Sequence, residues 1–207
     1  AECLVGSEMC IRDSFYPEGG GQIGDTGEII SNSASIAVKN TFRDGEDIIH
    51  LVDNLPIELG DSLLMKIDKN RRLSIQRNHT STHLLQFALK KTLGNHVEQR
   101  GSMLTEDIFR FDFSHQSKLS NKELSDAEKI VKSLIKDEIQ CIEEKQANYN
   151  DAVKAGAIGL FSEKYGDVVR TIKFGESYEL CGGTHVKNTR EIEDFKIISE
   201  GSQAFGI

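Results

Sequence analysis

Two short metal-ligand patterns, far apart in the chain, constrain this sequence more than any other feature. The first is His79-x-x-x-His83, in a stretch of helical periodicity, so that both imidazoles project from one helix face. The second is Cys181-x-x-x-His185, which encloses two glycines that allow a loop to curl tightly. Imidazole nitrogens and one thiolate suit Zn²⁺ better than Mg²⁺ or Ca²⁺. The fold must therefore bring a helix and a loop together around one predicted zinc ion.

Each half of this pattern is weak evidence alone, because a histidine pair at helical spacing more often packs or lies on the surface. The two halves together favour a metal site. A zinc peptidase is disfavoured, because those enzymes place a glutamate directly after the first histidine and this chain has Thr80 there. We expect ordinary structural roles for the remaining histidines, His50, His96 and His115, and for Cys141.

Composition restricts the class of protein. With 207 residues and 38 % hydrophobic content, the chain can form one large domain or two small ones. No apolar run approaches the ~20 residues that cross a bilayer, so we expect a soluble, cytoplasmic protein without a membrane partner. Four cysteines without dense spacing predict free thiols rather than disulfides. The net charge of -8 argues against wrapping a long nucleic acid but permits gripping one nucleotide end.

The first residues carry a separate signal. The run Leu4–Asp13 matches the translation of a common transposon-derived sequencing adapter. We therefore expect residues 1–14 to be non-native, native sequence to begin near Ser14 or Phe15, and Cys3 and Cys10 to have no function. The missing initiator Met and an end within strand-and-turn sequence predict a C-terminally truncated internal fragment of a longer protein.

Residues 15–70 predict a glycine-rich β domain. Short β-rich runs at 35–42, 48–52 and 62–67 are separated by turn residues. We expect them to form a small, partly open β-barrel-like domain. The basic stretch 69–72 marks its expected boundary.

Residues 71–207 predict an α+β domain with helices packed on a mainly antiparallel sheet. A helix is expected over 73–93, ending at Gly94. The capping box Ser120-x-x-Glu123 predicts a long helix that extends to about Tyr149. Strands are expected at 97–104, 108–113, 168–174 and 195–198.

Four motifs, in the expected order, resemble the editing region of alanyl-tRNA synthetases and of their free-standing relatives, the AlaX proteins. They are the glycine-rich stretch 15–27, the histidine-bearing stretch 79–85, the stretch 101–115 and the loop 179–185. The resemblance spans about residues 15–207. It is specific, because four separate motifs agree.

The resemblance implies an aminoacyl-tRNA deacylase within an alanine–tRNA ligase. The ester that links serine or glycine to the terminal adenosine of tRNA(Ala) is hydrolysed, while alanyl-tRNA is spared. Serine exceeds alanine by one hydroxyl, which an apolar synthetic pocket cannot strongly reject, so a second site is the physical remedy. The implied partners are the aminoacylated 3′ end of tRNA(Ala) and the rest of the synthetase in cis, which would supply affinity that this acidic part lacks.

The resemblance also assigns roles to residues around the metal. Thr82 is the candidate for sensing the serine hydroxyl, and Gln99 lines the same pocket. The alternative for Thr82 is a hydrogen bond to the backbone one helical turn earlier. Gly20, Gly21 and Gln22 are expected to shape the mouth of the substrate pocket. The alternative is a plain turn, which the two glycines suit equally well.

The number of predicted ligands leaves the role of zinc open. Zinc can lower the pKa of a bound water to ~7 and polarise a carbonyl. Catalytic zinc normally keeps one position open, whereas four protein ligands describe a closed structural site. Either His185 yields to substrate, or the coordination expands, or zinc organises the pocket while another group positions water.

Three alternatives fit the same sequence. One is a free-standing AlaX-type deacylase that edits in trans, and another is the related zinc editing domain of threonyl-tRNA synthetases. The third is a non-catalytic, zinc-stabilised RNA-binding module. The glycine-rich stretch and the Cys-Gly-Gly-Thr-His loop favour the alanyl type.

Overall fold

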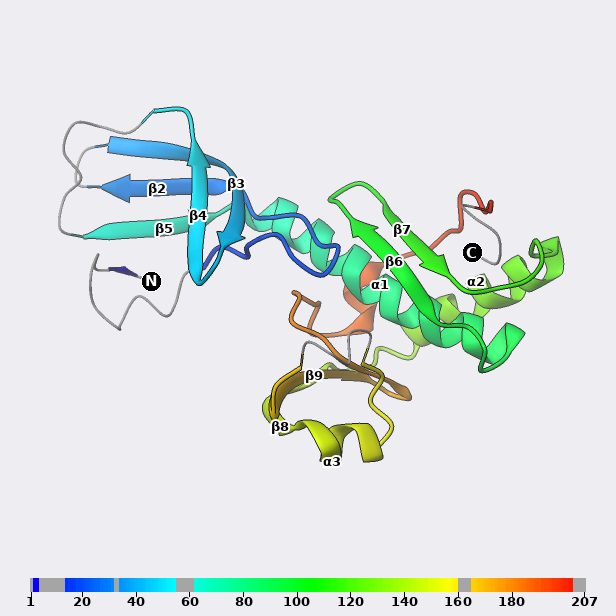
Figure 1. Cartoon of the computed structure of the whole chain (residues 1–207). Helices are drawn as coiled ribbons and strands as arrows, with labels where there is room; N and C mark the ends of the chain where they lie inside the picture. The colour runs from blue at the N-terminus through cyan, green and yellow to red at the C-terminus, as the bar shows by residue number, and fades with distance from the viewer. Residues whose placement is uncertain (1, 4–13, 32–33, 55–61, 160–164, 203–207) are drawn as a thin grey trace.

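The computed structural model describes residues 2–3, 14–31, 34–54, 62–159 and 165–202. The adapter-like run, residues 4–13, lies outside this part of the chain. A β-sheet at one end is joined by a long helix to the remaining elements, which surround that helix (Figure 1). The described residues contain no helix that is long and apolar enough to cross a membrane.

The N-terminal sheet has five strands in the order β1-β5-β2-β3-β4, and all neighbours are antiparallel. Among the described residues the sheet is open, with β1 and β4 as its edges, so the β-barrel-like arrangement expected for residues 15–70 is not shown. A register shift between Val38 and Asn40 bends β3, and β4 crosses β2 and β5 (Figure 1). The strands are β1 Glu2–Cys3, β2 Gly27–Ser31, β3 Ala34–Asp44, β4 Asp47–Val52 and β5 Leu63–Ile67.

The core of this sheet confirms the strand pattern expected for residues 35–42. Ile36 and Val38 are buried, whereas their neighbours Ser35 and Ala37 are exposed, as strand alternation requires. Phe15 is only 2 % exposed and packs with them. The sequence analysis expected β3, β4 and β5. It did not expect β2, because polar and apolar side chains do not clearly alternate along that strand.

Helix α1, Lys69–Leu93, connects the sheet to the rest of the molecule. Asp68 caps its first turn by accepting hydrogen bonds from the backbone N–H groups of Asn70 and Arg71. The helix therefore begins at Lys69 rather than residue 73, and the expected boundary stretch forms its first turn. It ends as predicted at Gly94, whose positive φ of 115° suits glycine.

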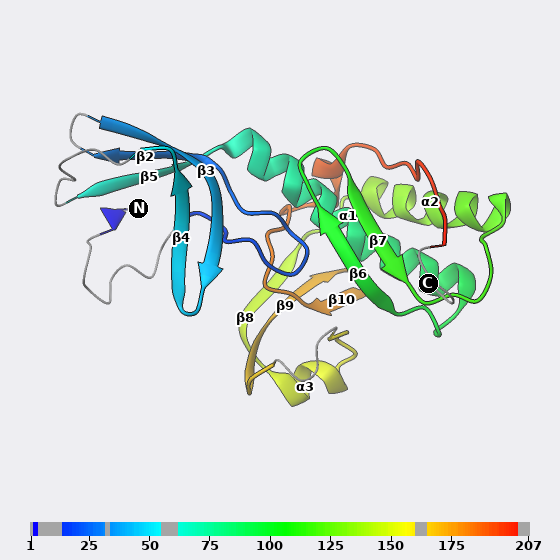
Figure 2. The same cartoon turned by 45° about the horizontal axis from the view of Figure 1, so that its top comes forward.

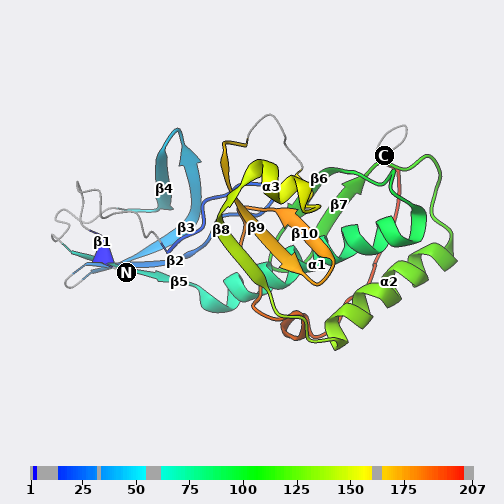
Figure 3. The ribbon, with the colours of Figure 1, turned by 90° about the horizontal axis from the view of Figure 1, so that it is seen from below.

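Two further sheets contact α1. The β6–β7 hairpin lies on one side of the helix, and the antiparallel sheet β10-β9-β8 lies on the other (Figure 2). Helix α2 runs beside α1 (Figure 3). The elements are β6 Gln99–Leu104, β7 Phe109–Phe113, α2 Asn121–Lys136, β8 Ile142–Asn148, α3 Tyr149–Lys154, β9 Val168–Phe174 and β10 Ser177–Leu180, followed by a 3₁₀ helix at Thr189–Ile192.

The prediction of a long helix that extends from the Ser120 capping box to about Tyr149 is correct as far as Lys136 and wrong beyond it. The capping box is confirmed, with the backbone N–H of Ser120 donating to Glu123 and that of Glu123 donating to the Ser120 hydroxyl. Helix α2 nevertheless ends at Lys136, and Glu138 adopts a positive φ of 48°. The next segment forms β8, because strand pairing with β9 overrides its helical propensity.

Two other expectations need correction. Residues 195–198 form no regular strand in the structure; Phe195 instead stacks on Phe109 with ring centroids 6.1 Å apart. Cys141 is not inside a helix but precedes β8, where its backbone N–H donates to the Lys187 carbonyl. The overall class is nevertheless α+β with antiparallel sheets, as expected.

Candidate metal centre and adjoining cavity

The middle of α1 is buried around its whole circumference. All residues from His79 to Gln86 are buried, although several are polar. A helix that is enclosed on every side is normally apolar. The polar residues here therefore need partners from other elements, and His79 and His83 lie among them.

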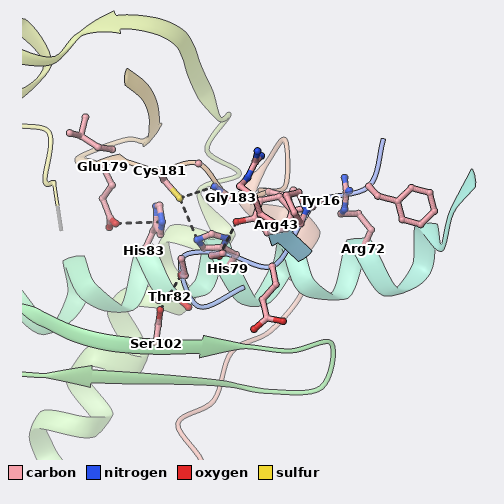
Figure 4. Close-up of a pocket in the computed structure, with 18 of the residues that line it drawn as sticks. Tyr16, Arg43, Arg72, His79, Thr82, His83, Ser102, Glu179, Cys181 and Gly183 are labelled. Carbon is pink, nitrogen blue, oxygen red and sulfur yellow. Dashed lines mark hydrogen bonds and ion pairs between the residues drawn. The ribbon is translucent and has the colours of Figure 1, made fainter. Parts of the chain in front are cut away.

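The loop that follows β10 supplies the other two predicted ligands. One potential ligand atom from each of His79, His83, Cys181 and His185 lies within 4.8 Å of all the others. The Cys181 sulfur is 3.4 Å from His79 Nε2 and 3.3 Å from His185 Nε2. Figure 4 shows His79, His83 and Cys181 converging from the helix and the loop. The structure thus brings together all four predicted ligands in a group that can hold a metal ion.

Two of the histidines are oriented through their outer ring nitrogens. His79 Nδ1 lies 2.8 Å from Gln22 Oε1, and His185 Nδ1 lies 3.2 Å from the hydroxyl of Thr80. In both rings Nε2 is then the nitrogen that faces the cysteine sulfur. Such outer partners commonly fix the orientation of metal-binding imidazoles.

The surroundings of the third histidine, His83, indicate whether the cluster fits a metal ion. His83 Nε2 lies 3.4 Å from a carboxylate oxygen of Glu179, and both side chains are buried (Figure 4). His83 Nδ1 is also buried and has no hydrogen-bond partner in the described part of the chain. A buried polar atom without a partner is costly. A cation bound by the cluster would satisfy it.

The charge states also suit a metal centre. Desolvation lowers the pKa of His79 to about 3, and it lowers the pKa values of His83 and His185 well below their ordinary value. The imidazoles are therefore neutral, with lone pairs available. Desolvation raises the pKa of the Cys181 thiol to about 12. The thiolate that binds metal consequently requires a compensating cation.

The cysteine loop is held by Arg170. Its Nη1 donates to the carbonyl oxygens of Cys181 at 2.8 Å and Gly183 at 2.6 Å, while its Nε donates to Glu143 at 2.7 Å. Gly183 lies directly against the imidazole of His79. An added Cβ there would come within 2.0 Å of His79 Cε1, so this close approach requires glycine.

The glycine-rich stretch reaches the same place from the N-terminal sheet. The Gly21 carbonyl accepts a hydrogen bond from the Leu104 backbone, and the Ile23 N–H donates to the Leu104 carbonyl, so the stretch lies along β6. A Cβ on Gly21 would come within 2.5 Å of the Ser102 carbonyl oxygen. The Gln22 side chain is fully buried and contacts His79 and Thr184.

A cavity of about 710 Å³ opens between the metal cluster and the N-terminal sheet. Three candidate metal ligands, His79, His83 and Cys181, contribute to its wall. Residues from the other side include Phe15, Tyr16, Pro17, Gly19, Arg43 and Ile48. A cluster that borders an open cavity can act on a bound molecule.

The other predicted site residues divide into two groups. Thr82, Gln99 and Gly20 line the cavity, whereas Gly21 and Gln22 are not among its lining residues. The Thr82 hydroxyl donates to the Asn78 carbonyl at 2.9 Å, which is the backbone bond expected as its alternative role. Its side chain therefore makes that bond and also borders the cavity.

Sequence reasoning missed the outer partners of the cluster. Glu179 belongs to the recognised 179–185 motif, so the motif itself was a signal. Thr80 directly follows the first histidine, and its hydroxyl could have been considered as a hydrogen-bond partner for a metal ligand. Arg170 lies within a strand and carries no signal of its own.

Comparisons with known proteins agree with the resemblance. The model of the threonyl and alanyl tRNA synthetase second additional domain matches residues 169–207, and the class II (A) tRNA synthetase model matches residues 9–71. The alanine–tRNA ligase of Christiangramia forsetii is 46 % identical over 197 residues, which are 95 % of this chain and 23 % of that protein. The corresponding ligase of Thermotoga maritima is 46 % identical over 200 residues, again 95 % of this chain and 23 % of the relative. The chain thus spans about a quarter of the length of the curated relatives it matches.

Proposed function

The chain belongs to the alanine–tRNA ligase family, and from that premise we propose that it is an editing domain that hydrolyses Ser-tRNA(Ala) or Gly-tRNA(Ala). The observation that carries the proposal is the His/His/Cys/His cluster, three of whose four residues lie in the wall of the 710 Å³ cavity. A metal buried away from any cavity would support only the fold. Here the cluster and the space for a substrate share one wall.

Zinc is the metal we propose. Three neutral imidazoles and one thiol form a donor set that suits it, and the unpartnered Nδ1 of His83 indicates an ion at this place. When bound, zinc supplies Lewis acidity, which can polarise an ester carbonyl and acidify a water molecule. His79, His83, Cys181 and His185 would hold it.

Thr82 accounts for the choice of serine over alanine. Its hydroxyl donates its proton to the Asn78 carbonyl, so the same oxygen is left to accept a hydrogen bond from a molecule in the cavity that Thr82 lines. A seryl group can donate one and an alanyl group cannot. Sites that hydrogen-bond a substrate hydroxyl can reject an analogue without it by ~10⁴–10⁵-fold. Gln99, which also lines the cavity and donates to Ser102 at 3.2 Å, would shape the same wall.

The far side of the cavity suits the nucleotide end of the substrate. Tyr16 offers an aromatic ring and Arg43 offers a positive charge at the cavity wall (Figure 4). Aromatic rings stack on unpaired bases, and arginine attracts phosphate. A cavity of this size can accept an aminoacyl group together with the terminal adenosine. Gly20 also lines the cavity, and the next two residues, Gly21 and Gln22, hold this stretch against Leu104 of β6.

The proposed partners are the aminoacylated 3′ end of tRNA(Ala) and the rest of a synthetase in cis, in the cytoplasm. The net charge of -8 predicts weak tRNA binding by this chain alone. A tRNA already held by another part of the same protein would reach the cavity at high effective concentration. An AlaX-type editor working in trans would lack that advantage.

The test is deacylation of Ser-, Gly- and Ala-tRNA(Ala) by the zinc-loaded protein, with and without a chelator. We expect the seryl ester to be hydrolysed fastest and the alanyl ester to be spared, and we expect the chelator to abolish the activity. A zinc-loaded protein that hydrolyses none of the three would contradict the proposal. That result would favour the non-catalytic RNA-binding module.

A further inference from the structure

The side chain of Gln22 joins the N-terminal glycine-rich stretch to both halves of the metal centre. It is fully buried. Its Oε1 lies 2.8 Å from His79 Nδ1 and accepts a hydrogen bond from the Thr184 backbone N–H at 3.0 Å. Its Nε2 donates to the Thr184 hydroxyl at 3.0 Å. One amide therefore contacts the helix-borne ligand and the ligand loop together.

These contacts determine which nitrogen of His79 carries the proton. The backbone N–H of Thr184 can only donate, so the amide atom that faces it must be the carbonyl oxygen of Gln22. The same oxygen faces His79 Nδ1, which must then be the donor. The proton is thus held on Nδ1. The lone pair of Nε2 is left facing the cluster, 3.4 Å from the Cys181 sulfur.

The backbone around Gln22 keeps this amide in place. Gly19 and Gln22 exchange two backbone hydrogen bonds of 3.0 Å, which close a tight turn. Gln22 also forms a parallel bridge with Leu104 at the end of β6. A Cβ on Gly183 would approach Gln22 Oε1 to 3.0 Å, so the ligand loop packs directly on the amide. The orientation of the Gln22 amide is therefore fixed by its own backbone turn on one side and by the ligand loop on the other.

We propose that Gln22 is a positioning residue of the metal centre, which holds His79 in the tautomer that binds metal through Nε2 and fastens the ligand loop at Thr184. This inference rests on the proposed zinc site. It gives the glycine-rich stretch a role in metal binding that is distinct from shaping the cavity, and it makes the N-terminal unit part of the metal centre. Loss of such an outer partner typically weakens metal binding by ~10–100-fold.

The experiment compares zinc affinity, measured by competition with a chelator, in the wild type and three variants. Gln22→Met keeps the length but loses both hydrogen-bonding functions, and we expect zinc binding ~10–100-fold weaker. Gln22→Glu keeps an acceptor for His79 and Thr184, and we expect it to restore affinity close to the wild-type value. Gln146→Met, at an exposed position of β8, is the matched control and should bind like the wild type.

A second measurement does not depend on any variant folding. ¹⁵N imidazole spectra of the zinc-loaded wild type should show His79 protonated at Nδ1, whereas protonation at Nε2 would overturn the inference. So would a folded Gln22→Met protein with wild-type zinc affinity, because a merely structural glutamine would change stability alone. Zinc binding by the wild type separates the two proposals. If the wild type takes up no zinc, the proposed metal centre fails and this inference fails with it.

Discussion

The two halves of the metal centre are held in different ways. His79 and His83 project from the interior of a 25-residue helix, so their spacing is set by regular backbone geometry. Cys181 and His185 lie on a loop whose shape depends on contacts with Arg170, Thr80 and other distant residues. The helix half is built by local structure and the loop half by long-range contacts. Changes that disturb the loop should therefore weaken metal binding more than changes on the helix that spare the ligands.

Removal of the loop thiol should have the largest effect. Cys181→Ala deletes a ligand, so zinc content and Ser-tRNA(Ala) deacylation should both be lost, beyond the ~10–100-fold weakening expected for an outer partner. Metal analysis and a deacylation assay check this. Cys141→Ala is the control, because Cys141 is a half-buried free cysteine outside the cluster. A zinc-free Cys181→Ala protein with full activity would remove zinc from the mechanism.

The next effect concerns the close approach of the loop to the helix. In Gly183→Ala the new methyl would lie 2.0 Å from His79 Cε1, so the loop or the ring must move. We expect weaker zinc binding and a loss of about 1–3 kcal/mol in the free energy of unfolding. Gly182→Ala is the matched control, since no atom lies within 4 Å of its added Cβ. Equal zinc affinities for the two variants would show that the loop is not tightly held.

Arg170→Met tests the contacts that hold the loop without touching a ligand side chain. It removes the donors to the carbonyls of Cys181 and Gly183. The side chain is 26 % exposed, so we expect a loss of about 1–2 kcal/mol in stability, measured by denaturant unfolding, and a moderate loss of zinc affinity. Arg190→Met, at an exposed position, should change neither. An unchanged Arg170→Met protein would mean that the loop keeps its shape alone.

The smallest effect on the metal should come from the helix. Thr82→Val removes one hydrogen bond to Asn78, with an expected cost of about 1 kcal/mol or less, and leaves both histidine ligands in place. Zinc affinity should remain near the wild-type value. Discrimination between seryl and alanyl esters should nevertheless decline, which paired deacylation rates would measure. A large loss of zinc affinity with unchanged discrimination between the two esters would contradict this prediction. It would show that Thr82 supports metal binding and not substrate selection.

The same difference explains what the sequence could predict. The 3.6-residue period of α1 and its Gly94 end are local signals, and so is the Ser120 capping box; all three were confirmed. Strand β8 was missed because its pairing partner, Val168–Phe174, lies later in the chain. Its own Glu- and Lys-rich sequence favours helix.

The candidate site shows the same limit. The four ligands were found from their spacing and residue types, and the structure brings them together. The contacts of Arg170 and Gln22 were not found, because each depends on residues that approach only in the folded chain. Gln22 was expected at the pocket mouth from its motif, whereas its amide faces the metal cluster. Motif and spacing identify ligands, but they do not show what orients them.

The most direct test of the proposed zinc-dependent deacylation is a zinc titration of the metal-free protein, with the rate of Ser-tRNA(Ala) deacylation measured at each addition. We expect little activity without zinc and a linear rise in the rate that ends at one equivalent of zinc per chain. Ala-tRNA(Ala) should remain intact throughout. A metal-free protein that hydrolyses Ser-tRNA(Ala) as fast as the zinc-loaded one would contradict the proposal that zinc is required for the hydrolysis.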